Sequence, residues 1–98
     1  MIAKRTLCLF WERDRRFADA RRALQDWRSQ VRRADWATPA GVKATYGDAS
    51  ILKDSRVVFN VCGNKYRLIA KINYPYRVVY VRFVGTHAEY DAVDSESV

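Results

Sequence analysis

The spacing of the apolar residues changes along the chain, and this change limits the folds that the chain can adopt. Between residues 17 and 31, apolar side chains recur at intervals of three and four, at Phe17, Ala20, Leu24, Trp27 and Val31. This spacing puts them on one side of an amphipathic helix and leaves the arginines between them facing outward. From residue 57 onward the apolar residues instead come in short runs typical of strands. Helices followed by strands predict an α+β domain, with the helices packed on one face of a sheet.

Two further helical segments are predicted. Residues 4–13 form a helix that precedes the apolar stripe, and residues 14–16 join the two helices. This join is either the turn of an antiparallel hairpin or a bend within one helix. Farther along, Thr38 followed by Pro39 is a helix-start signal, with Thr38 as the N-cap and Pro39 at the first helical position.

Three strands are predicted, at residues 57–62, 66–72 and 78–84. The dipeptide Gly63-Asn64 between the first two suits a tight turn that needs positive φ, and residues 73–76 form the next turn. Such short connections indicate an antiparallel meander. The acidic residues 91–98 lack periodicity and are expected to fray.

Length and composition exclude several classes of protein. Ninety-eight residues suffice for one domain, expected to span residues 1–98. No run of 18 apolar residues predicts a membrane span, and residues 1–5 do not resemble a signal peptide, so we expect a cytoplasmic protein. Its two cysteines, Cys8 and Cys62, are then expected to stay reduced. With a single histidine, His87, the chain is not expected to hold a zinc ion or to need a cofactor.

The charge balance predicts a polyanionic partner. Lys and Arg number 18 against 11 Asp and Glu, a formal net charge of +7. Residues 43–82 hold eight of these basic residues and only two acidic ones, Asp48 and Asp54.

Strand alternation predicts where part of this charge lies. In the middle strand, four residues form the more apolar face and should contact the helices: Tyr66, Leu68, Ala70 and Ile72. Arg67 and Lys71 then point to the opposite, open face. If Val79, Val81 and Phe83 line the core in the last strand, Arg82 also reaches the open face. Neighbouring strands are therefore expected to bring Arg67, Lys71 and Arg82 together.

A cluster that could transfer protons follows the last strand. Thr86 can cap a short helix in which His87, Tyr90 and Asp91 stand at i, i+3 and i+4 and share one face. Histidine suits proton transfer near neutral pH, and Arg or Lys suits phosphate binding. The pattern therefore fits metal-free RNA cleavage, in which a ribose 2′-OH attacks the adjacent phosphate. It also fits a hydrogen-bonded cap in which Tyr90 packs on the sheet.

Tyrosines offer a second kind of RNA contact. Tyr66, Tyr74 and Tyr76 are candidates to stack on splayed bases, or else to pack in the core and the turns.

Two segments form specific motifs: the hairpin Phe59-Asn60-x-x-Gly63-Asn64 and the terminal Thr86-His87-x-Glu89-Tyr90-Asp91. These segments resemble the HigB toxins of type II toxin–antitoxin systems, within the wider RelE/ParE-like superfamily. The resemblance covers nearly the whole chain. Cys62 departs from it, because a small residue such as Gly or Ala is expected there.

The resemblance implies a RelE-like fold and an mRNA interferase that cleaves translated mRNA on the ribosome without a metal. It also implies a cognate antitoxin with a helix-turn-helix domain. Carried onto this chain, Arg67 and Arg82 would hold the scissile phosphate, and His87 and Tyr90 would transfer protons. Lys65 or Lys71 would contact backbone phosphate.

Two other functions remain open from the sequence. A ParE-like toxin would inhibit DNA gyrase without cleaving RNA, and an RNA-binding module would bind without chemistry. The cluster of His87 and Tyr90 beside Arg82 favours cleavage over gyrase inhibition, because a protein inhibitor would not require it.

Overall fold

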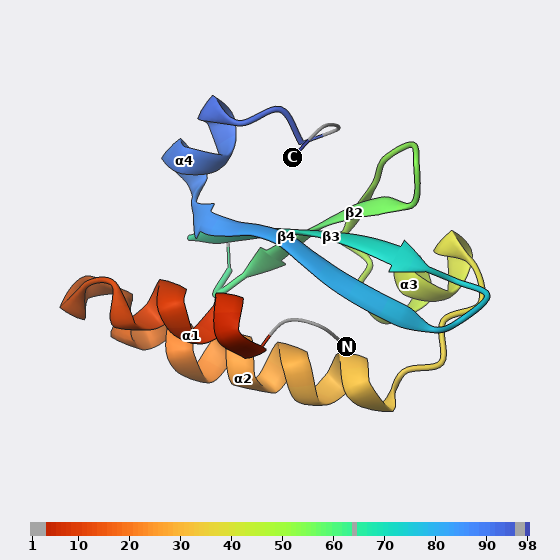
Figure 1. Cartoon of the computed structure of the whole chain (residues 1–98), viewed down its shortest axis with the longest axis horizontal. Helices are drawn as coiled ribbons and strands as arrows, with labels where there is room; N and C mark the ends of the chain where they lie inside the picture. Colours follow the sequence, from red (N-terminus) through yellow and green to blue (C-terminus); the bar gives the residue numbers. More distant parts are fainter. Residues whose placement is uncertain (1–3, 64, 96–97) are drawn as a thin grey trace.

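The computed structural model describes residues 4–63, 65–95 and 98. Its elements in chain order are α1 (Lys4–Glu12), the 3-10 helix η1 (Arg15–Phe17), α2 (Ala18–Arg33), α3 (Pro39–Thr45), β1 (Ser50–Ile51), β2 (Arg56–Val61), β3 (Tyr66–Asn73), β4 (Val78–Thr86) and α4 (His87–Ala92). The four strands form an antiparallel sheet in the order β1-β2-β3-β4. Helices α1 and α2 lie against one face, and α4 lies on the other side at one end of the sheet (Figure 1). The predicted α+β class and antiparallel meander are confirmed.

The first two helices form an antiparallel hairpin (Figure 1), which decides between the two possibilities that the sequence left open. Asp14 is the N-cap of η1 and has an extended conformation, and its side chain accepts a hydrogen bond from the Arg16 amide at 3.0 Å. This cap reverses the chain and ends the helical path of α1. The predicted apolar stripe then packs inward, since Ala20, Leu24, Trp27 and Val31 are all buried.

Helix α3 starts as predicted. The Thr38 hydroxyl accepts a hydrogen bond from the Gly41 amide at 3.3 Å, and Pro39 occupies the first helical position.

Among the described residues, no helix is long and apolar enough to cross a membrane.

The turn between β2 and β3 has positive φ at Cys62 and Gly63, with values of 55° and 66°. The predicted dipeptide was Gly63-Asn64, and Asn64 lies outside the described residues. The backbone at Cys62 therefore adopts the left-handed region, where glycine has no Cβ penalty. This gives a physical reason for the glycine that the resemblance leads to expect at this position, but not for alanine, which also has a Cβ.

The predicted faces of β4 are wrong after Val81, because the strand contains a bulge. Ala70 pairs with Val81 but Ile69 pairs with Phe83, so Arg82 is an extra residue in β4. The alternation shifts by one, and Val84 packs against the core while Phe83 turns to the opposite face. A bulge depends on strand pairing, which single-strand alternation does not report.

The second face of the sheet was expected to be open, and it is partly covered. Val58 and Ile69 lie on this face and are only 3% and 0% exposed. Helix α4 packs against β4 and β3. Arg56 donates a hydrogen bond to the Val98 carbonyl at 3.1 Å. Residues 91–98 were expected to fray. Of the residues described there, Asp91 and Ala92 instead form the end of α4, and Val98 accepts the hydrogen bond from Arg56.

Candidate functional site

Helix α4 begins with a capping box. The Thr86 hydroxyl accepts a hydrogen bond from the Glu89 amide at 3.2 Å, and the Glu89 carboxylate accepts one from the Thr86 amide at 3.0 Å. The predicted cap at Thr86 is confirmed. His87 is consequently the first residue of α4, directly after the last residue of β4.

His87 is oriented by Asp91, one turn farther along α4. Its Nδ1 lies 3.0 Å from Asp91 Oδ2. A carboxylate only accepts hydrogen bonds, so this contact puts the proton on Nδ1 and leaves Nε2 as the acceptor of the neutral ring. The Tyr90 ring lies edge-on to the imidazole, with centroids 6.4 Å apart. The predicted helical face of His87, Tyr90 and Asp91 is therefore present, with His87 side-chain exposure of 52%.

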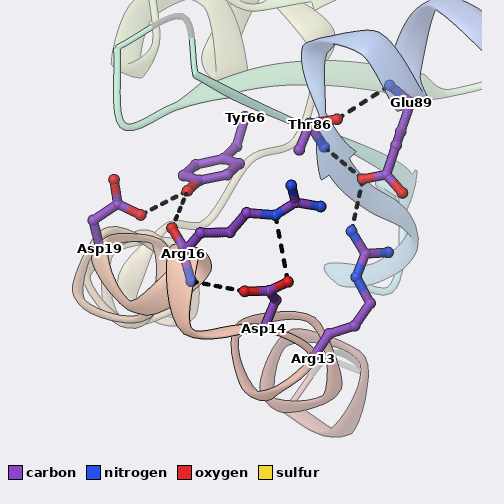
Figure 2. Close-up of polar contacts among 7 residues, drawn as sticks. All are labelled: Arg13, Asp14, Arg16, Asp19, Tyr66, Thr86 and Glu89. Carbon is purple, nitrogen blue, oxygen red and sulfur yellow. Dashed lines mark hydrogen bonds and ion pairs between the residues drawn. The ribbon is translucent and has the colours of Figure 1, made fainter.

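An ion pair ties this end of α4 to the helical hairpin. Arg13 Nη2 lies 2.8 Å from Glu89 Oε1, across the space between the α1–α2 turn and α4 (Figure 2). The hydrogen bond from Arg13, with that from the Thr86 amide, lowers the pKa of Glu89 to about 2. Sequence reasoning missed Arg13, because 76 residues separate the two partners.

Tyr66 is a core residue rather than a surface ring. It is 1% exposed, and its hydroxyl donates to Asp19 at 2.6 Å, with the Arg16 carbonyl at 3.4 Å (Figure 2). Burial, with the bond to Asp19, raises the pKa of Tyr66 to about 12. Because the ring is buried, it is not placed to stack on an RNA base. The structure therefore does not support the expectation that Tyr66 contacts RNA.

Lys65 lies at the rim of a pocket that also contains His87. Its ammonium group pairs with Asp19, and this hydrogen bond raises the pKa of Lys65. The pocket has a volume of about 530 Å³ and is lined by Arg16, Phe17, Lys65, Tyr66, Thr86, His87 and Ala88. The structure thus brings His87 and Lys65 together and adds Arg16, which sequence reasoning did not select.

The other predicted residues lie elsewhere on the sheet. Arg67 is half-buried and faces Gly85 of β4, one residue before Thr86. Lys71 is four residues farther along β3, a rise of about 13 Å, and it pairs with Asp54 at 3.5 Å. Arg82 is exposed at the bulge of the edge strand. Of these three residues, Arg67 therefore lies nearest to α4 along the paired strands. Lys71 lies in a separate region, beside Asp54.

This arrangement provides groups for proton transfer and for charge neutralisation, from different elements. His87 offers Nε2 and Tyr90 offers a phenol. Arg67 offers a guanidinium group at the adjoining end of the sheet, and Arg82 offers one at the bulge farther along β4. Within the described ranges, no cluster of three or more His, Cys, Asp or Glu is arranged to hold a metal ion.

The fold and this cluster define a small α+β domain with a polar cluster where its last strand meets a short helix. Residues 20–93 match the family HigB_toxin, described as the RelE-like toxic component of a toxin–antitoxin system. The match covers most of the chain, and the chain therefore belongs to the HigB toxin family.

Curated relatives carry the same name. The chain is 38% identical over 55 residues to the mRNA interferase toxin HigB of Escherichia coli K12, covering 54% of this chain and 53% of that protein. It is 29% identical over 84 residues to the mRNA interferase HigB of E. coli O6:H1, covering 84% and 82%. The first of these matches thus spans about half the length of the relative.

Proposed function

We propose that this protein is the toxin of a type II toxin–antitoxin system and an endoribonuclease that cleaves translated mRNA on the ribosome. Membership of the HigB toxin family and the names of its relatives support this proposal. The single structural observation that carries it is the 3.0 Å contact between His87 and Asp91, which leaves Nε2 of an exposed imidazole available for proton transfer.

In the proposed reaction the ribose 2′-oxygen forms a bond to phosphorus while the bond from phosphorus to the 5′-oxygen breaks. The products are a 2′,3′-cyclic phosphate and a 5′-hydroxyl. His87 and Tyr90 take up the proton of the 2′-OH and supply the proton of the leaving oxygen. Arg67 and Arg82 neutralise the charge that develops on the phosphate. Lys65 and Lys71 contact flanking phosphates.

The proposal also includes a partner. The toxin–antitoxin description of the family supports a cognate antitoxin that neutralises this chain, and the resemblance supports a helix-turn-helix domain in that antitoxin.

The test is cell-free translation of a defined mRNA with purified protein, followed by mapping of new 5′ ends. Parallel reactions contain the mRNA without ribosomes, the Tyr90→Phe variant, and Tyr76→Phe as the matched control. Tyr76 is 79% exposed in the β3–β4 turn, so its loss of a hydroxyl should leave cleavage intact. We expect new ends only with ribosomes, a loss of about tenfold or more for Tyr90→Phe, and none for Tyr76→Phe.

Other outcomes would contradict the proposal in distinguishable ways. Cleavage without ribosomes would keep the nuclease and remove the ribosome from its mechanism. Equal activity of both tyrosine variants would remove Tyr90 from the site. Absence of cleavage by a protein that is toxic in cells would favour a non-nuclease target such as DNA gyrase.

A further inference from the structure

The outward surface of α2 carries a group of arginines that the proposed cleavage site does not use. Four are exposed and Arg28 is half-buried, and the group is Arg21, Arg22, Arg28, Arg32 and Arg33. Among the residues that the structure describes, none of these five side chains forms a hydrogen bond or an ion pair. Asp26, also exposed, is the acidic residue that lies between them on α2. We call these five residues the arginine face.

Many cations elsewhere on the molecule are already compensated by a carboxylate. Four ion pairs join Arg13 to Glu89, Lys65 to Asp19, Lys71 to Asp54, and Arg77 to Asp35. The net charge of +7 is consequently not spread evenly. A large uncompensated share lies on α2, rather than on the sheet where the sequence placed the binding surface.

The arginine face has a regular geometry. Arg21, Arg28 and Arg32 are spaced seven and four residues apart, which aligns them in one row about 16 Å long. Beside this row, a hollow of about 330 Å³ is lined by Ser29, Arg32 and Arg33. Guanidinium groups donate and never accept, and the hydroxyl can also donate, so the hollow suits an anion with several acceptor oxygens.

The composition of the face favours phosphate over an acidic protein as its partner. Protein interfaces depend on buried aromatic or aliphatic anchors. Within the described residues, the large apolar side chains that are exposed are Leu9, Ile51 and Tyr76, and none belongs to α2. Arginine, in contrast, matches phosphate with two parallel hydrogen bonds.

We propose that the arginine face binds the phosphate backbone of a folded RNA, separately from the strand that is cleaved. Helices α2 and α4 lie on opposite sides of the sheet (Figure 1), and none of the five arginines lines the pocket that contains His87. The choice of RNA over DNA rests on the proposed function, in which the protein acts on translated mRNA. Backbone contacts of this kind provide affinity and position without reading sequence.

The test compares two variants that lose the same charge from different surfaces. One is Arg21→Gln/Arg28→Gln/Arg32→Gln, which keeps good helix formers on α2. The control is Lys43→Gln/Lys53→Gln/Arg77→Gln, which takes one cation from α3 and two from the loops that precede β2 and β4. Circular dichroism melts verify that both fold. Fluorescence anisotropy then measures binding to an RNA hairpin with 2′-O-methyl riboses, and to a DNA hairpin of the same sequence, across a salt series.

We expect the α2 variant to bind the RNA hairpin about tenfold or more weakly, and its slope of log affinity against log salt to fall by about 2. The control should keep most of the affinity and the slope. The methylated hairpin lacks a free 2′-OH, so its binding reports on the arginine face independently of cleavage activity.

Three results would overturn the inference. The first is an equal loss of affinity for the RNA hairpin in the two variants, which would show that only the net charge matters. The second is failure of the unmodified protein to bind the RNA hairpin, or binding of the DNA hairpin alone. The third is unchanged RNA binding by the α2 variant. If that variant also no longer co-purifies with a co-expressed antitoxin, the partner of the arginine face is an acidic protein.

Discussion

Gly85 determines how closely α4 and β4 can approach each other. A Cβ added at this position would lie 2.7 Å from Cζ of Phe83 and 3.1 Å from Oε1 of Glu89. The absence of a side chain at Gly85 therefore leaves room for the Phe83 ring, which the bulge has turned to this face, and for the carboxylate that receives Arg13. Gly85 thus leaves room for both the bulged strand β4 and the first turn of α4.

We expect Gly85→Ala to destabilise the protein by about 1–3 kcal/mol, because the new methyl group must displace the Phe83 ring or the Glu89 side chain. For a domain of this size, each kcal/mol corresponds to a fall of about 4–8 °C in Tm. Gly47→Ala is the matched control, since an added Cβ there meets nothing within 4 Å. Thermal melts that place the two variants together would contradict this account of Gly85.

At the scale of elements, α4 is a short helix held by contacts at its first turn. The capping box joins Thr86 to Glu89, and the same carboxylate receives Arg13 from the α1–α2 turn (Figure 2). Six residues are too few for a stable isolated helix. The position of His87 therefore depends on its connection to β4 and on this ion pair with the helical layer.

The ion pair predicts a specific dependence of stability on pH. The pKa of Glu89 falls from 4.5 to about 2 on folding, so its contribution is present above pH 4.5 and is lost as the pH falls through about 2. We expect Glu89→Gln to lower Tm at neutral pH and to reduce the loss of Tm between about pH 5 and pH 2.

Some acid sensitivity should remain in this variant, because the pKa values of Asp19 and Asp54 are also lowered, by Lys65 and Lys71 first of all. Melts over a pH series test the prediction. An unchanged slope of Tm against pH would show that the Arg13–Glu89 pair does not couple α4 to the hairpin.

At the scale of the whole molecule, the two faces of the sheet have different roles. One face carries Tyr66 and Leu68 into the helical layer, and the other holds Arg67 between Asn60 of β2 and Gly85 of β4. Because Arg67 lies outside the helix-facing core, its contribution to folding and its proposed contact with phosphate can be separated by mutation.

We expect Arg67→Ala to abolish toxicity in cells while the purified variant melts cooperatively, with Tm close to that of the parent protein. Arg15→Ala, which removes an exposed arginine from η1, should remain toxic and serves as the control. Toxicity of Arg67→Ala at equal expression would exclude Arg67 from the proposed site, whereas a large fall in Tm would make its role structural.

Local patterns in the sequence predicted much of this fold. The stripe from Phe17 to Val31, the Thr38 cap, the three main strands and the Thr86 cap depend on residues within a few positions of one another. Their periodicity and capping chemistry therefore show without knowledge of the fold. The candidate cluster of His87, Tyr90 and Asp91 was visible for the same reason, since one helical turn joins its members.

Contacts between distant segments were decided only by the tertiary structure. The bulge at Arg82, the Arg13–Glu89 pair and the burial of the Tyr66 hydroxyl on Asp19 join residues that are far apart in the chain or depend on strand pairing. The balance of charge belongs with them, because folding pairs Arg56 and Lys71 of the sheet with Asp54 and leaves the arginines of α2 without partners among the described residues. A sequence reports which charges exist, whereas their distances, and therefore their interactions, exist only once the chain has folded.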